Sequence, residues 1–331
     1  MTGAVAVRLA AFAGALAFAF AGAFALGSAV EPVAAADPAP HTDAPAGGMG
    51  EMGNHAAGNG SDQPGAQPPG LAVSETGYTL VPSTTFFAAG KQESLRFVIK
   101  GPDGRPVTAY EKTHEKDLHL IVVRRDLSGF RHVHPTRDTA GTWSIPFTFG
   151  AGGTWRVFTD FAPAGLGRTL TLGTDVNVSG LYIPVPLPEA SSVTSIDGYD
   201  VTLGGKPVAG KESELTFTIS RGGKPVTDLQ PYLGAFGHLV SLRSGDLAYL
   251  HNHPAQLAAT GSKGGPEIRF GTTFPTAATY SLFLDFQHAG FVHTAEFTVT
   301  VDASGNQTIA PPATMPTGTP DHESTPHAAS N

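Results

Sequence analysis

The sequence predicts an all-β protein with two tandem sandwich domains, and three observations support this prediction. A stretch of about 105 residues occurs twice in the chain, which marks two whole domains. Both copies contain short segments such as SLRFVIK and TYSLFLDF, whose alternation of apolar and polar residues is that of a half-buried strand. Neither copy has a long helical period, while turn signals such as GPDGRP and RGGKP recur. About 105 residues in about seven short strands per copy match an immunoglobulin-like sandwich in size.

An export segment is expected first, over residues 1–36. Arg8 precedes a long apolar run rich in alanine and phenylalanine, and VAAAD at 33–37 offers a small-x-small cleavage site. The run is also long enough to span a membrane, so retention as an anchor stays open. In both cases the rest of the chain is exported to the periplasm, the cell surface or the medium, with membrane contact only through this segment.

Two segments flanking the repeats are predicted to be disordered, namely residues 37–74 and the tail 303–331. Both are rich in small residues and proline, and neither has hydrophobic periodicity. Apart from Met1, every methionine lies in them, close to histidines: Met49, Met52, His55, Met315, His322 and His327. Chance composition and loose capture of a soft metal ion such as copper(I) are the two interpretations.

The two repeats are expected at 75–180 and 198–302, joined by a linker at 181–197. HLIVVRRDLSGFRHVHP, beginning at residue 119, aligns without a gap on HLVSLRSGDLAYLHNHP, beginning at residue 238. Later, GTWRVFTDF aligns with ATYSLFLDF. Alternate residues of these last strands should face the two cores: Trp155, Val157, Thr159 and Phe161 in the first repeat, and Tyr280, Leu282, Leu284 and Phe286 in the second.

Composition excludes several classes of function. The formal net charge is −8 and no basic patch stands out, which argues against nucleic-acid binding. The chain has no cysteine, so disulfides, thiolate metal sites, thiol catalysis and a bacterial lipid anchor are all excluded. No Gly-x-Ser-x-Gly elbow, phosphate loop or HExxH motif is present, and we predict that the protein is not an enzyme.

The histidines carry the functional signal. The pattern His-x12-His-x-His-Pro occurs in both repeats, although neighbouring residues differ between the copies. Residues two apart on a strand point to one face, and a hairpin with an even loop would place the first histidine opposite the third. We therefore expect a metal site in each repeat, formed by His119, His132 and His134 in the first and by His238, His251 and His253 in the second.

The second repeat is predicted to hold the richer site. Asp285 ends a strand, and His288 and His293 follow it closely, whereas the first repeat keeps only the aspartate, Asp160. Imidazoles with a carboxylate suit copper(II) or zinc(II), and raw affinity favours copper(II).

Two resemblances bear on these residues. GHLVSLRSGDLAYLHNHP and FPTAATYSLFLDFQHAGFVHTAEFTV resemble a cassette of bacterial exported heavy-metal- or copper-binding proteins, similar in character to the CopC and YtkA-like copper-carrier sandwiches. This resemblance implies a β-sandwich and extracytoplasmic metal handling. Those carriers commonly use a mature N-terminal histidine, whereas cleavage here leaves Asp37. GFRHVHP resembles the copper-ligand strand of Cu/Zn superoxide dismutase, but no histidine follows His134 in the first repeat to bridge to a zinc subsite.

The sequence thus favours an exported copper(II)-binding protein, with zinc as the second choice of metal. It would act as a carrier, buffer or resistance factor, with a membrane copper transporter as a candidate partner. The alternative is a structural or protein-interaction module at the cell surface that binds no metal. A dismutase-like redox enzyme is the third reading.

Overall fold

The computed structural model describes residues 68–304, so the expected export segment, the tail from 305 and most of the expected linker lie outside the described residues. Every regular element in the described range is a β-strand. None of the described residues belongs to a helix with the length and apolarity needed to cross a membrane. Of the flanking segment 37–74, residues 68–74 are described, and there the Gly70 amide donates to the Thr171 carbonyl of the first repeat at 2.8 Å.

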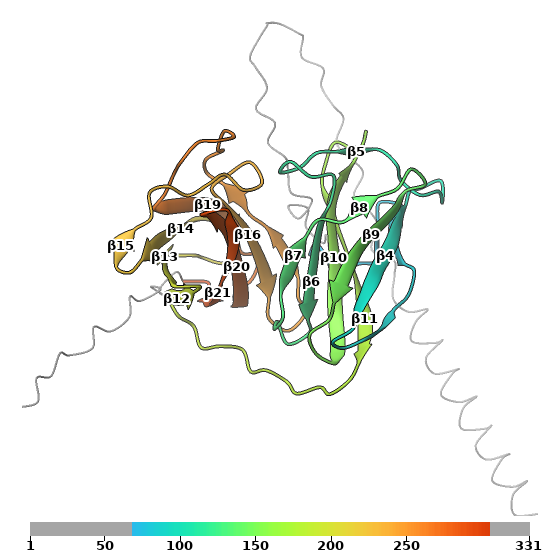
Figure 1. The fold of residues 1–331 in the computed structure, drawn as a ribbon, viewed down its shortest axis with the longest axis horizontal. Helices are drawn as coiled ribbons and strands as arrows, with labels where there is room; N and C mark the ends of the chain where they lie inside the picture. The colour runs from blue at the N-terminus through green and yellow to red at the C-terminus, as the bar shows by residue number, and fades with distance from the viewer. Residues whose placement is uncertain (1–67, 305–331) are drawn as a thin grey trace, which may run out of the picture. The chain divides into compact units, whose positions relative to one another are not determined.

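The first repeat is a sandwich of two sheets (Figure 1). One sheet has the order β1-β2-β4-β9-β8, and the other has the order β3-β11-β10-β6-β7, with β5 also paired to β10. The strand bounds are β1 Ser74–Glu75, β2 Tyr78–Pro82, β3 Phe86–Ala88, β4 Gln92–Lys100, β5 Tyr110–Glu111, β6 His119–Arg124, β7 Arg131–Val133, β8 Thr136–Arg137, β9 Thr142–Thr148, β10 Gly153–Pro163 and β11 Leu170–Ser179.

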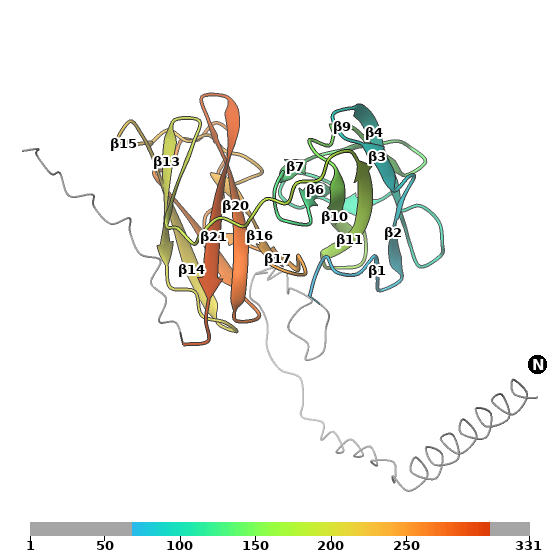
Figure 2. The ribbon, with the colours of Figure 1, turned by 90° about the horizontal axis from the view of Figure 1, so that it is seen from below.

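The second repeat has the same plan (Figure 2). Its sheets are β12-β13-β14-β19-β18, with β15 also paired to β14, and β17-β16-β20-β21. The strand bounds are β12 Val193–Ile196, β13 Tyr199–Gly205, β14 Glu212–Arg221, β15 Lys224–Pro225, β16 Gly237–Arg243, β17 Tyr249–His251, β18 His253–Pro254, β19 Glu267–Thr273, β20 Ala278–His288 and β21 Phe291–Val301. The prediction of an all-β chain with two tandem immunoglobulin-like sandwiches is confirmed.

Each sandwich encloses its own apolar core, and the alternation along β10 and β20 predicted which residues enter it. Trp155, Val157 and Phe161 lie in the first core, and Thr159 is fully buried. The four residues predicted from β20, Tyr280, Leu282, Leu284 and Phe286, all lie in the second core. The strand period therefore identified the inner face of the sheet correctly in both repeats.

A third apolar cluster joins the two sandwiches, which belong to one compact unit. It is formed by the opposite face of the same strands, so β6 and β16 are buried along nearly their whole length. Phe130 stacks on Phe283 with ring centroids 3.9 Å apart, and Phe158 lies 5.8 Å from Tyr249. The repeat alignment equates Phe130 with Tyr249 and Phe158 with Phe283, so the two ring pairs are equivalent. Such reciprocal contacts are the mark of an isologous, two-fold interface.

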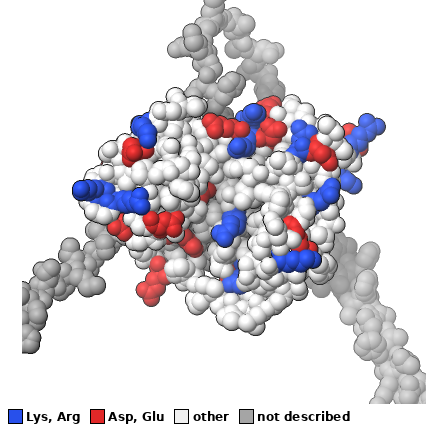
Figure 3. Space-filling view, viewed as in Figure 1, with Lys and Arg blue, Asp and Glu red and all other residues white. Residues whose placement is uncertain are grey.

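On the face of the molecule in Figure 3, basic and acidic side chains lie interspersed, so no large patch of a single charge is present there.

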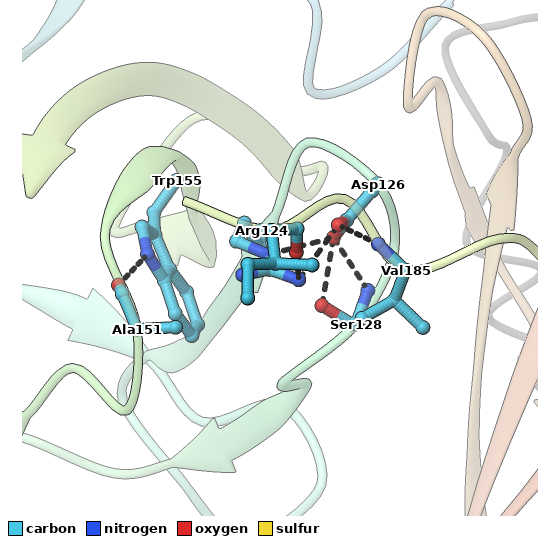
Figure 4. A network of polar contacts seen from close by, with 7 residues as sticks. Arg124, Asp126, Ser128, Ala151, Trp155 and Val185 are labelled. Carbon is cyan, nitrogen blue, oxygen red and sulfur yellow. Dashed lines mark hydrogen bonds and ion pairs between the residues drawn. The ribbon is translucent and has the colours of Figure 1, made fainter. Parts of the chain in front are cut away.

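An ion pair holds the linker between the repeats to the first repeat (Figure 4). Arg124 forms an ion pair of 2.7 Å with Asp126. Asp126 also accepts hydrogen bonds from the Ser128 hydroxyl and, at 2.9 Å, from the Val185 amide of the linker. Arg124 also donates to the Ile183 carbonyl and lies over the Tyr182 ring. The turn residue Asp126 thus anchors exposed linker residues.

Replacing Asp126 with alanine is expected to release this linker. The substitution removes the charged partner of the buried Arg124 guanidinium, at a cost of about 1–3 kcal/mol, and also removes the acceptor of the exposed Val185 amide. Limited proteolysis should then cut residues 181–192 faster than in the wild type. Asp246→Ala is the matched control, because Asp246 pairs with Arg243 in the equivalent turn of the second repeat. Equal cutting rates in the two variants would contradict the assignment.

Candidate metal centre

The hairpin of β6 and β7 brings three histidines together in the first repeat. Leu120 pairs with Val133 and Ile121 with His132, and the same register sets His119 opposite His134. The chain turns through Leu127 and Gly129, both with φ of 69°. The loop therefore has the even parity that the sequence argument required. All three imidazoles lie on the face of the sheet turned toward the second repeat.

The three rings converge on one point. One nitrogen from each of His119, His132 and His134 can be chosen so that all three lie within 4.8 Å of one another. The Nδ1 atom of His119 lies 3.0 Å from Nε2 of His132 and 3.2 Å from Nε2 of His134. Nitrogens bound to one metal at ordinary lengths lie about 2.9 Å apart at a right angle and about 3.3 Å apart in a tetrahedron. The two distances from His119 Nδ1 therefore fit a first-row transition metal ion.

The outer nitrogens of two rings fix their tautomers. His119 Nε2 lies 2.9 Å from the carbonyl oxygen of Thr113, which only accepts, so this nitrogen carries the hydrogen. His132 Nδ1 lies 2.8 Å from Oδ2 of Asp285 and donates to it in the same way. In the neutral rings, His119 Nδ1 and His132 Nε2 then both present bare lone pairs, 3.0 Å apart. Two such acceptors do not hydrogen-bond to each other, and a cation between them, either a proton or a metal ion, satisfies both.

Burial keeps two of the three rings neutral. Burial, followed by the charge of neighbouring His132, lowers the pKa of His119 to about 3, although Asp160 acts in the opposite direction. Burial, together with His132 and His119, also lowers the pKa of His134 to about 3. Both rings are therefore neutral near pH 7, and neutral imidazole is the form that binds metal ions.

Two further imidazoles border the three. The ring of His238, at the start of β16, stacks on His119 at 5.3 Å with an interplanar angle of 8° and lies 4.7 Å from His132. The ring of His114 lies 5.3 Å from that of His238. His114 and Glu115 both have positive φ, in a tight turn closed by Thr113 and Lys116. His114 was not among the predicted ligands, because Leu233 takes its place in the second repeat and the duplication therefore gave no signal.

The two predicted carboxylates occupy equivalent buried positions. Asp160 pairs in register with His119, and Asp285 pairs with His238. Thr171 donates to Asp160 at 2.8 Å, and Thr294 donates to Asp285 at 2.6 Å. Asp285 binds the His132 nitrogen that points away from the other rings, so it supports a ligand and does not itself face the candidate metal position. The expectation that it is a direct ligand does not match this geometry.

The expected pairing of His238 with His253 is wrong. His253 is exposed and lies in β18, where it pairs with Gly271 of the other sheet. The difference lies at Asn252, which is buried and donates to the Leu239 carbonyl at 3.0 Å, whereas the first repeat has Val133, the last residue of β7, at this position. The backbone of His251 lies in β17 opposite Val240, and its side chain is outside the described part of the structure.

His288 and His293 do not join the centre either. The strand β20 continues through His288, so Asp285 and His288, three residues apart, point to opposite faces. His288 contacts the Tyr199 hydroxyl at 2.6 Å and Asp228 at 2.9 Å. The partner of His293 is Asp197, at 2.8 Å. The ligand set expected in the second repeat is thus divided among separate places, and His238 borders the centre of the first repeat.

Comparison with protein families supports the duplication. A family model described as "Domain of unknown function (DUF8832)" matches the chain twice, at residues 72–179 and 194–303. No curated protein matches the chain.

Solved structures with low similarity include an adhesin, an S-layer protein and a butyrophilin. The Escherichia coli adhesin FdeC is 19% identical over 70% of this chain and 65% of its own, with a TM-score of 0.23. Domains 4 and 5 of the S-layer protein SbsC are 11% identical over 70% and 100%, with a TM-score of 0.21. Bovine butyrophilin is 9% identical over 68% and 98%, with a TM-score of 0.20. The chain thus spans slightly less than two thirds of the adhesin, and likeness at this level supports no statement about function.

Proposed function

The chain belongs to the DUF8832 family, with two copies of its domain, and from that premise we propose that it binds a divalent metal ion through His119, His132 and His134. The observation that carries the proposal is the convergence of one nitrogen from each of the three rings, while the outer nitrogens of His119 and His132 already have acceptors. A metal ion at this point would be ligated by all three nitrogens. A hydrogen-bonded outer shell of this kind typically orients histidine ligands.

Copper(II) is the metal that we favour, with zinc(II) second. Three neutral imidazoles suit both ions, and the order of affinities places copper(II) above zinc(II). The likeness of the second repeat to exported copper-binding cassettes points in the same direction. The role that we propose is carriage or buffering of copper outside the cytoplasm, because three protein ligands leave a coordination position through which a donor or acceptor, such as a membrane copper transporter, exchanges the ion.

A metal titration of the whole protein tests this function. Copper(II), or zinc(II) in its place, should bind with a stoichiometry near one and raise the melting temperature. A ligand that binds only the folded state adds about 2.7 kcal/mol at a free concentration of 100 Kd. Calcium(II), which prefers oxygen ligands, is the control ion and should change nothing. A flat calorimetric trace with an unchanged melting temperature for both copper and zinc would overturn the proposal and leave the structural module as the better reading.

A further inference from the structure

We propose that the metal centre is shared between the two repeats, with Asp285 of the second as the positioning residue for His132 of the first. Metal binding and docking of the two sandwiches are then coupled. This inference rests on the proposed function and extends it, because the sequence pattern assigned each repeat a site of its own.

The contact between His132 and Asp285 is buried on both sides. Their side chains are only 1% and 3% exposed, and the contact joins residues 153 positions apart in the chain. Both carboxylate oxygens of Asp285 are engaged, one by the Thr294 hydroxyl and the other by His132. A buried carboxylate needs such partners, since an unpaired charge in the interior is costly. The pair is therefore a fixed element of the interface.

The centre lies on the face that the two repeats share. Ile121 and His132 are register partners in β6 and β7, and Ile121 packs in the apolar cluster between the sandwiches. Phe283, two residues before Asp285 in β20, packs in the same cluster. The stacking of His119 on His238 joins equivalent residues of the two repeats. The three ligands thus belong to the first repeat, while Asp285 and His238 beside them belong to the second.

This arrangement couples two equilibria. The Asp285 carboxylate holds His132 with its hydrogen on Nδ1, leaving Nε2 free and more basic for the metal. Separation of the repeats removes that carboxylate, so the docked state binds the ion more tightly. By linkage, the bound ion favours the docked state by the same factor. The metal therefore acts as a clamp between the two domains.

The variant Asp285→Asn tests the positioning role. Asparagine keeps the shape and one acceptor oxygen but loses the charge, and copper(II) affinity is expected to fall about 10–100-fold. The visible and electron paramagnetic resonance spectra of the copper-loaded protein should shift as well, which a merely structural role would not cause. Asp197→Asn is the matched control, because Asp197 also binds a histidine, His293, away from the centre. Its affinity and spectra should equal those of the wild type.

A second pair of variants tests the coupling. Leu247 packs in the cluster between the sandwiches but follows the end of β16 that is remote from His238, whereas Leu203 packs in the core of the second repeat alone. Leu247→Ala is expected to weaken metal binding several-fold while the protein remains folded, and Leu203→Ala should leave the affinity unchanged. If the wild type binds metal but both alanine variants and both asparagine variants bind as tightly, the shared centre is refuted and the proposed function stands. If the wild type itself binds no metal, both fail.

Discussion

Replacing His134 with alanine is expected to abolish the metal-induced rise in melting temperature and to lower copper(II) affinity by at least about 100-fold, since losing a ligand costs more than losing an outer-shell partner. His134 is the ligand to choose, because its removal leaves the buried contacts of His119 with Thr113 and of His132 with Asp285 intact. Competition titration against a chelator of known affinity, with circular dichroism to confirm folding, measures the loss.

His253→Ala is the matched control for this prediction. His253 holds the same place in the second copy of the histidine pattern, yet it is exposed and lies in the other sheet. Its removal should leave both the affinity and the melting-temperature response as in the wild type. Weaker binding in the His253 variant than in the His134 variant would mean that the sequence pattern, and not the geometry of the first repeat, identifies the site.

The fold could be predicted because its signal is local. Alternation along segments such as TYSLFLDF identifies strands and their inner faces without knowledge of what the strands contact. The convergence of the three histidines in the first repeat was also predictable, because a hairpin with an even loop brings His119, His132 and His134 to one face of the sheet. Both predictions rest on residues that are close in sequence.

The second repeat shows where this reasoning fails. Its histidine spacing is identical, but Asn252 replaces Val133 and binds the backbone of Leu239, so β17 ends one residue earlier than β7 and His253 pairs with the other sheet. A buried asparagine in a strand is a visible signal of such a break, because its amide must find partners. The role of Asp285 had no comparable signal, since its partner lies in the other repeat.

The interface between the repeats did leave a trace in the sequence. HLIVVR and HLVSLR are nearly continuous apolar runs, and a strand with one solvated face would alternate. The structure explains the runs, because one face of β6 and β16 enters the core of its own repeat and the other enters the shared cluster. Such runs, occurring at the same position in both copies, indicate that the two domains bury a common face.

That common face should be a large part of the stability of the protein, and Phe283→Ala is the most direct test. Phe283 is 1% exposed and stacks on Phe130 across the interface. Truncating a buried phenylalanine leaves a cavity and costs about 3–5 kcal/mol. Because the cavity lies between the sandwiches, we expect chemical denaturation to change from one cooperative transition into two, as each repeat begins to unfold by itself.

Phe291→Ala serves as the control, because Phe291 is in the next strand but 70% exposed. Surface substitutions of this kind usually change the free energy of unfolding by less than about 0.5 kcal/mol. If Phe283→Ala costs no more than Phe291→Ala, the two repeats do not bury this face in solution. The contact between His132 and Asp285 would then lose its support as well, because β20 carries both Phe283 and Asp285 into the interface.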